Sequence, residues 1–237
     1  MRTVGRVASL WRYPVKSMCG LQTAEIFVGF RGICGDRMYA IHNARARPDF
    51  PYFTAREQGR MLQYRPRLGY NDETDLEIEL PGGKKYGITD PKLLASLQAG
   101  LPDRFELALL RSERALTDCS PVSLISTQTV QQLSRELGKV VDQRRFRANL
   151  YLYLDLGIGF AEDQFVGRNL KIGSQVILAA VQRDVRCKMI TLDPDTFEPD
   201  PELMKLVARQ HDSCVGIYAN VLAEGAIRPG DLIEVLD

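Results

Sequence analysis

The chain has 237 residues, of which 45% are hydrophobic and 26% charged, a composition typical of a globular protein large enough to bury a substantial core. Thirty-one basic against thirty acidic side chains leave a formal net charge of +1, so no overall attraction to nucleic acid is expected. No segment approaches the roughly 20 apolar residues of a membrane helix, and the N-terminus lacks the apolar core of a signal peptide. Five scattered cysteines do not suggest a disulfide framework, and a cytoplasmic location is predicted.

Short strand patterns follow one another along most of the chain. The clearest alternation of apolar and polar residues covers residues 76–80 and ends at a Pro-Gly-Gly turn. A second alternation covers residues 150–156, where four leucines share one face. Further strands are predicted at residues 7–13, 170–181, 214–222 and 232–236.

Three short helices are predicted from their end signals. Asp90 and Asp200 each precede a proline, which combines an N-cap residue with a first-turn proline. Ser126 is an N-cap candidate in front of a helical stripe of apolar residues. Gly100 predicts the end of the helix that begins after Asp90, and Gly138 predicts the end of the helix that begins after Ser126.

Many short strands with few helices favour a mainly β fold, a β-barrel or α+β architecture, over a parallel α/β sheet. We predict two domains, residues 1–112 and residues 113–237, with the boundary between the strand-rich first half and the Ser126 helix. No low-complexity linker separates them, so the two parts are expected to pack closely.

Several chemistries find no support in the sequence. The two histidines, His42 and His211, have no second histidine at ligand spacing, so a closed zinc site would need an unusual long-range assembly. Gly29, Gly32 and Gly35 are not followed by a helix pattern, which argues against a dinucleotide-binding fingerprint. No Gly-x-Ser-x-Gly elbow of a serine hydrolase is present.

Cys187 is the most informative residue. It lies between Arg186 and Lys188, after a predicted strand and before an acidic, proline-broken turn at residues 193–196. Neighbouring cations favour the thiolate, which is the form of cysteine that binds metals or attacks electrophiles. For the turn at 193–196 itself, a hydrogen-bonded Asx turn is the favoured interpretation.

Several polar loops could bind an anion or a polar ring. They contain Lys16 and Ser17 after the first strand, Arg37 after the glycine-rich loop, Asp118 and Ser120 in a polar loop, and Arg147 and Asn149 before a strand. Each residue alone is more often a surface charge or an exposed polar group than a ligand.

Taken together, these segments resemble the MOSC family, which is named for the C-terminal domain of molybdenum cofactor sulfurase. The resemblance is nearest to the two-part members that include the mitochondrial amidoxime-reducing component and its bacterial relatives, and it runs nearly end to end. The segments that match the N-terminal β-barrel part are 13–17, 36–37 and 54–57, and those that match the MOSC part are 118–121, 145–149, 186–196 and 225–231.

This resemblance implies a bound molybdenum cofactor, a pterin dithiolene with a terminal phosphate. Cys187 matches the protein thiolate on molybdenum, and Asp118 matches a position near the metal, so these two are the predicted catalytic residues. The residues that match positions holding the pterin and phosphate are Lys16, Ser17, Arg37, Ser120, Arg147 and Asn149. Two departures stand out, because Ala148 replaces a frequent proline and Lys188 and Ile190 differ from the usual residues after the cysteine.

Three functional hypotheses follow. The first is a molybdenum-dependent oxidoreductase that reduces N-hydroxylated or other N-oxygenated small molecules, with electrons from a separate ferredoxin- or cytochrome-type donor. The second is a carrier that holds a persulfide on Cys187 or passes on the cofactor without turnover. The third is a β-barrel domain in which Cys187 is an ordinary buried thiol.

Overall fold

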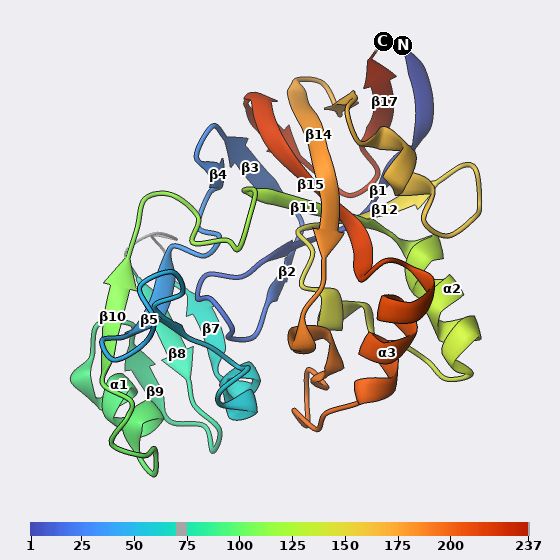
Figure 1. Cartoon of the computed structure of the whole chain (residues 1–237). Helices are drawn as coiled ribbons and strands as arrows, with labels where there is room; N and C mark the ends of the chain where they lie inside the picture. The colour runs from blue at the N-terminus through green and yellow to red at the C-terminus, as the bar shows by residue number, and fades with distance from the viewer. Residues whose placement is uncertain (70–74, 237) are drawn as a thin grey trace.

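The computed structural model describes residues 1–69 and 75–236. Its centre is a closed barrel of seven strands in the order β12-β11-β15-β14-β13-β17-β1, closed by pairing of β1 with β12 (Figure 1). Among the described barrel strands the β11–β12 pair is parallel and the others are antiparallel. The strands are β1 (Arg2–Arg12), β11 (Val122–Ser126), β12 (Leu150–Leu154), β13 (Asn169–Ile172), β14 (Val176–Val185), β15 (Cys214–Ala223) and β17 (Leu232–Leu236).

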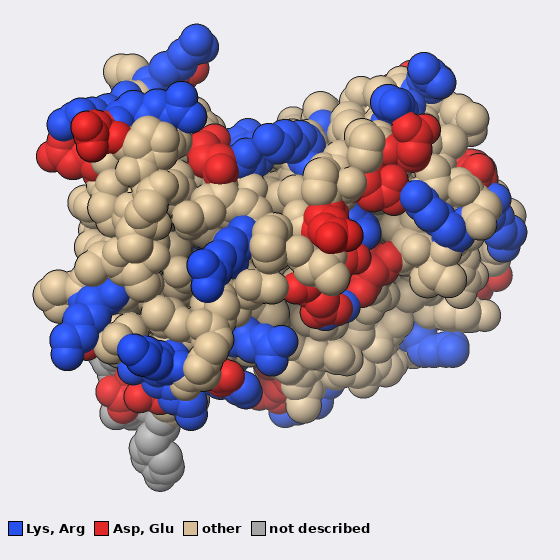
Figure 2. All heavy atoms as spheres, turned by 90° about the horizontal axis from the view of Figure 1, so that it is seen from below, with Lys and Arg blue, Asp and Glu red and all other residues tan. Residues whose placement is uncertain are grey.

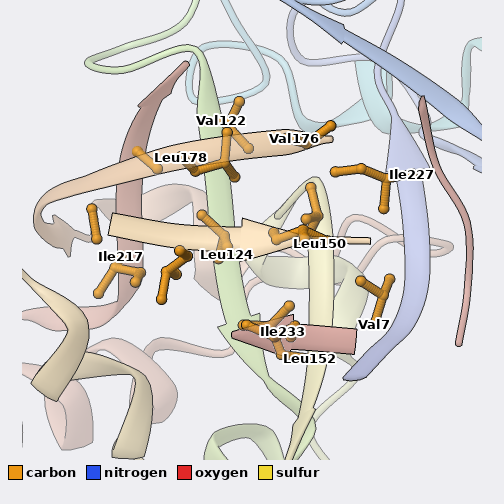
Figure 3. Packing of buried hydrophobic residues seen from close by; sticks show 14 of the residues in the cluster. Val7, Val122, Leu124, Leu150, Leu152, Val176, Leu178, Ile217, Ile227 and Ile233 are labelled. Carbon is orange, nitrogen blue, oxygen red and sulfur yellow. The ribbon is translucent and has the colours of Figure 1, made fainter. Parts of the chain in front are cut away.

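The barrel interior is the main hydrophobic core. Each barrel strand contributes buried residues to it, and Leu124, Leu150, Ile217 and Ile233 are each 0% exposed. Figure 3 shows these side chains, with Val7, converging from different strands. Burying one such side chain contributes about 1.5–3 kcal/mol to the stability of the fold. The predicted mainly β fold is therefore confirmed by the barrel and stabilised by its interior.

The predicted alternation at residues 150–156 is correct for the strand but not for its last leucine. Leu150, Leu152 and Leu154 face the barrel interior, whereas Leu156 is 59% exposed. The strand ends at Leu154 because its carbonyl accepts a hydrogen bond from the amide of Gly157 at 3.2 Å, which turns the chain. The pattern therefore extends beyond the strand.

The predicted strand at residues 170–181 is two strands. β13 and β14 form an antiparallel hairpin in which Ile172 pairs with Val176. Gly173, with φ of +62°, begins the turn in a backbone conformation that glycine tolerates. Apolar residues stand on both sides of this turn, so the spacing of apolar residues in the sequence did not predict where the turn lies.

The N-terminal half adds smaller sheets beside the barrel, drawn at the lower left of Figure 1. They enclose a second hydrophobic cluster that includes Ile41, Phe53 and Ile78. The strands of these sheets are β5 (Tyr39–Asn43), β6 (Tyr52–Phe53), β7 (Arg65–Leu68), β8 (Leu76–Glu79), β9 (Lys85–Gly87) and β10 (Leu107–Arg111). Three more strands pair as β16-β3-β4, namely β16 (Gly225–Ile227), β3 (Ile26–Gly29) and β4 (Gly32–Ile33). The short strand β2 (Leu21–Thr23) pairs antiparallel with the end of β1.

All three predicted helices are present. In α1 (Pro91–Gln98) the Asp90 side chain accepts a hydrogen bond from the amide of Lys92 at 2.9 Å, and in α2 (Thr127–Leu137) the Ser126 hydroxyl accepts one from the amide of Thr129 at 3.0 Å. Asp200 precedes α3 (Pro201–Gln210) but makes no capping bond through its side chain, which forms an ion pair with Lys139 instead. The 3-10 helices are η1 (Gly59–Gln63), η2 (Gln143–Phe146), η3 (Ala161–Phe165) and η4 (Lys188–Thr191).

The barrel is assembled from both halves of the sequence. β1 comes from the first predicted domain and pairs with β12 and β17 of the second, so the two chain ends lie side by side (Figure 1). The division into residues 1–112 and 113–237 stays a prediction. Within residues 1–69 and 75–236, none of the helices is both long and apolar enough to cross a membrane.

Candidate functional site

A cavity of about 310 Å³ lies where segments from both halves of the chain meet. All eight residues predicted from the sequence line it, namely Lys16, Ser17, Arg37, Asp118, Ser120, Arg147, Asn149 and Cys187. The sequence therefore located one common pocket, although the role of each residue in it stays a prediction.

Cys187 lies just beyond the end of β14. Its backbone is extended, with φ of −120°, and its carbonyl accepts a hydrogen bond from the amide of Ile190 that begins the turn of η4. The thiol is partly buried and lines the cavity. The end of the barrel strand therefore places Cys187 at the cavity, and the turn that follows also contributes lining residues, Met189 and Ile190.

Arg186 is held in place by two backbone carbonyls and a buried acid. Its Nε and Nη1 atoms donate to the carbonyls of Val215 and Phe146, both at 2.8 Å. Its Nη2 atom lies 2.8 Å from Oδ2 of Asp184. Asp184 therefore balances the Arg186 charge, while Lys188 points to solvent. The expectation that both neighbouring cations favour the Cys187 thiolate stays a prediction.

Lys16 and Asp118 form an ion pair across one hundred residues of sequence. The Lys16 ammonium lies 2.6 Å from Oδ1 of Asp118 and donates to the Leu116 carbonyl at 2.7 Å. Burial by itself would raise the pKa of Asp118, but the Lys16 charge outweighs it and holds this pKa below its ordinary value. Asp118 is therefore an ionised acceptor at neutral pH.

Arg37 and Arg147 flank a buried tyrosine. Their guanidinium groups lie 4.8 and 4.3 Å from the centre of the Tyr13 ring. Arg37 forms an ion pair with Asp36 and donates to the carbonyl of Arg147 at 2.8 Å. Burial raises the pKa of Tyr13 to about 12, so the ring stays neutral.

Arg147 keeps part of its hydrogen-bonding capacity unused. Its Nη1 atom donates to the Met18 carbonyl at 2.7 Å, whereas its Nη2 atom is buried and has no partner among the described residues. Unpartnered buried donors are rare in folded proteins. This one indicates a place for an acceptor that the chain itself does not supply.

Asn149 connects the barrel to the pocket through its amide group. Its Oδ1 atom accepts from the Ser123 hydroxyl at 3.1 Å and from Nη1 of Arg37 at 3.3 Å, and its Nδ2 atom donates to the Trp11 carbonyl at 3.2 Å. With 1% of its surface exposed, Asn149 holds Arg37 in place. Direct contact of Asn149 with a cofactor stays a prediction.

Three of the pocket residues have a backbone conformation that residues other than glycine rarely adopt. Ser17, Arg37 and Arg147 have φ values of 67°, 48° and 53°. Such conformations cost of order 1–3 kcal/mol each and cluster at functional sites. The chain maintains them here because each turn directs a polar side chain into the cavity.

The acidic turn after η4 is built as predicted. Oδ1 of Asp193 accepts from the amides of Asp195 and Thr196 at 3.0 and 2.9 Å, which confirms the Asx turn. The Asp193 carboxylate also pairs with Arg145 at 2.9 Å, and the Asp195 carboxylate pairs with Arg144 at 2.6 Å. Figure 2, a view from below, shows basic and acidic side chains intermixed on that face of the molecule.

Some lining residues were not predicted. Thr54 and Arg56 stand in a segment used for the family resemblance but not assigned to the site, and the Arg56 guanidinium lies 4.1 Å from the centre of the Phe50 ring. Asp184 and Tyr218 are two more lining residues. Asp184 falls on the same alternation as the buried residues of β14, and an acid at such a position is the signal that would have revealed it.

The comparisons with known proteins agree with this fold. The MOSC domain matches residues 111–234 and the MOSC N-terminal beta barrel domain matches residues 4–99. The chain therefore belongs to the MOSC family, and the predicted resemblance is confirmed. The family is associated with the molybdenum cofactor.

Two relatives and one solved structure match over most of this chain. Mitochondrial amidoxime reducing component 2 of Rattus norvegicus is 27% identical over 293 residues, which cover 98% of this chain and 83% of the relative. Mitochondrial amidoxime-reducing component 1 of Homo sapiens is 26% identical over 294 residues, with 100% and 84% covered. The YUAD protein from Bacillus subtilis shares the fold, with a TM-score of 0.54 and 15% identity over 99% of this chain and 97% of that one.

Proposed function

We propose that the pocket binds a molybdenum cofactor, with the Cys187 sulfur as the protein ligand of the metal, and that the protein reduces N-hydroxylated small molecules. Electrons would come from a separate ferredoxin- or cytochrome-type protein. The observation that carries this proposal is that a partly buried thiol and two arginines, which have no acidic partner within residues 1–69 and 75–236, line one cavity. Similarity to amidoxime-reducing components supports the reaction class.

The charges in the pocket suit a phosphorylated ligand. Six cations line it, and four of them are paired with acids, namely Lys16 with Asp118, Arg37 with Asp36, Arg145 with Asp193 and Arg186 with Asp184. Arg56 and Arg147 have no ion-pair partner among the described residues. A phosphate monoester carries about 1.5 to 2 negative charges at pH 7, and guanidinium groups match its geometry. The cofactor phosphate would therefore compensate both arginines.

The other residues would hold the remaining parts of the cofactor. Cysteine thiolate is a soft ligand that suits a metal already bound by dithiolene sulfurs. The Ser17 and Ser120 hydroxyls and the ionised Asp118 carboxylate supply acceptors and donors for a pterin edge. When bound, the cofactor would supply two-electron redox chemistry, and the chain would position it and the substrate.

Elemental analysis of molybdenum, with pterin fluorescence after oxidation, tests the binding site. The protein should be made in cells that synthesise the cofactor, alongside Cys187→Ser, Arg147→Gln and the matched surface control Arg67→Gln. Stoichiometric metal and pterin are expected in the wild type and in Arg67→Gln. We expect loss or alteration of the metal in Cys187→Ser and lower occupancy in Arg147→Gln.

Assays of the loaded wild type with a chemical reductant and N-hydroxylated compounds test the reaction. Reduction by the loaded protein, and none by the cofactor-free protein, is the expected result. Bound metal without turnover of any such compound would refute the reductase. A persulfide on Cys187 without molybdenum, detected by mass spectrometry of the native protein, would favour sulfur carriage instead.

A further inference from the structure

Asp184 is a buried acid in the wall of the pocket. It lies on β14, three residues before Cys187, and is 2% exposed. The pairing of β14 with β15 is irregular between Arg183 and Val185, opposite Gly216, whose φ is +78°. Bulges of this kind redirect side chains near active sites, and this one accompanies the placement of a carboxyl group in the cavity lining.

The surroundings of Asp184 only partly compensate its charge. Oδ2 lies 2.8 Å from Nη2 of Arg186, yet neither atom has a hydrogen-bond partner with suitable geometry in the described structure. Tyr218 on β15 is close enough to lower the pKa of this carboxyl group, and Arg37 and Asp118 are the other charged groups that act on it.

Burial is the largest influence on this carboxyl group. It raises the pKa of Asp184 to about 6, against the opposing effects of Arg186, Tyr218 and Arg37, and Asp118 raises it further. Asp118, held ionised by Lys16, has its pKa shifted the other way. Two carboxyl groups in one pocket with pKa values pushed apart are the arrangement expected of an acid and an acceptor.

We propose that Asp184 is the proton donor for reduction in this pocket, an inference that rests on the proposed function. Conversion of R–NH–OH to R–NH2 breaks the N–O bond, forms one N–H and one O–H bond, consumes two electrons and two protons, and releases water. The electrons come from the separate donor protein. Asp184 gives a proton to the departing oxygen, and solvent supplies the second proton and reprotonates Asp184.

The first test does not depend on activity. Carbon-13 NMR of cofactor-free protein labelled at the aspartate carboxyl carbons should show a resonance that titrates near pH 6 and is missing from Asp184→Asn. The matched control is Asp163→Asn, because Asp163 also has a raised pKa and pairs with an arginine, Arg183 at 2.9 Å, outside the pocket. A titration of Asp184 near the ordinary value of 3.8 would overturn the proposal.

The second test is the pH dependence of the loaded enzyme. For the wild type and Asp163→Asn, kcat should fall about tenfold per pH unit above about pH 6, as the acid form disappears. Asp184→Asn should keep its cofactor, lose this dependence and lower kcat about 100-fold at pH 6. An Asp184→Asn enzyme with unchanged kcat and pH profile overturns the inference alone, whereas a wild type inactive at every pH overturns the proposed function.

A third variant covers loss of folding or cofactor in Asp184→Asn. Tyr218→Phe removes the hydroxyl group whose effect lowers the pKa of Asp184, so the midpoint of the kcat profile should move to higher pH. A merely structural role for Asp184 would leave the midpoint where it is, and that result would also overturn the proposal.

Discussion

Replacing Asp36 by asparagine should test how the chain fixes the basic pocket. Asp36 is 1% exposed, its Oδ1 atom accepts from the amide of Tyr13 at 2.7 Å, and its other oxygen pairs with Arg37. Asparagine can keep the first bond but not the charge. Arg37, with 12% of its side chain exposed, would then be a buried cation without an acidic partner.

Removing one member of a buried ion pair costs about 3–5 kcal/mol. Arg37 would keep its bonds to the Arg147 carbonyl at 2.8 Å and to Asn149 at 3.3 Å, so we expect the lower end of this range. The free energy of unfolding of cofactor-free Asp36→Asn should therefore fall by about 3 kcal/mol. Cofactor content should fall as well, because Arg37 would no longer be held in one place.

Urea denaturation followed by the fluorescence of Trp11, the single tryptophan of the chain, measures this loss in the barrel itself. The control is Glu106→Gln, which breaks the exposed pair with Arg45, where the acid side chain is 64% exposed. That change should cost less than about 1 kcal/mol. An Asp36→Asn protein as stable as Glu106→Gln would refute the view that the Asp36–Arg37 pair fixes the pocket.

Three further changes test the core, the backbone and the titration of the site. Leu150→Ala empties a position that is 0% exposed in the barrel and should lower the free energy of unfolding in urea by about 2–5 kcal/mol; a loss below 1 kcal/mol would contradict the assigned core. Ser17→Gly, at φ of 67°, should raise the free energy of unfolding by about 1 kcal/mol yet lower cofactor content by elemental analysis, and a loss of stability would show that the conformation is not strained. Because Asp184 has a folded-state pKa raised to about 6, its contribution to stability is complete below pH 3.8 and is lost as pH rises through 6. The stability of the wild type relative to Asp184→Asn, from urea titrations at several pH values, should therefore fall between pH 4 and pH 7 by up to about 3 kcal/mol, and a flat difference would contradict the raised pKa.

Most strands of the barrel and the starts of the three α-helices could be predicted because their signals are local, whereas most of the short strands of the smaller sheets were not predicted. The strands at residues 214–222 and 232–236 agree with β15 and β17 to within one residue. The errors arise where a local pattern continues past the point at which tertiary contacts end it, as at Leu156. Barrel closure by β1 and β12 joins residues more than one hundred positions apart, and no local pattern reports such a pairing.

The residues of the candidate site also divide into those that the sequence could predict and those that it could not. Cys187, Lys16 and Arg147 stand in loops whose residue types and order match a known family, so a resemblance could find them. Asp184 and Tyr218 come together through the irregular pairing of two strands. Their burial, and the pKa values that follow from it, could not be deduced from the neighbouring residues in the sequence.

The charge pairing in the pocket suggests how a strongly basic cavity folds before it holds a ligand. Cations paired with protein acids, such as Lys16 and Arg37, are held in one arrangement, so a ligand that meets them need not order them. In Arg147, Nη1 donates to the Met18 carbonyl, but Nη2 has no partner among the described residues. The paired cations thus shape the site, and the unpaired cations gain the most favourable electrostatic interaction when an anion binds. Such a division favours a ligand whose charge is concentrated at one end, as in a pterin with a terminal phosphate, over one whose charge is spread along its length.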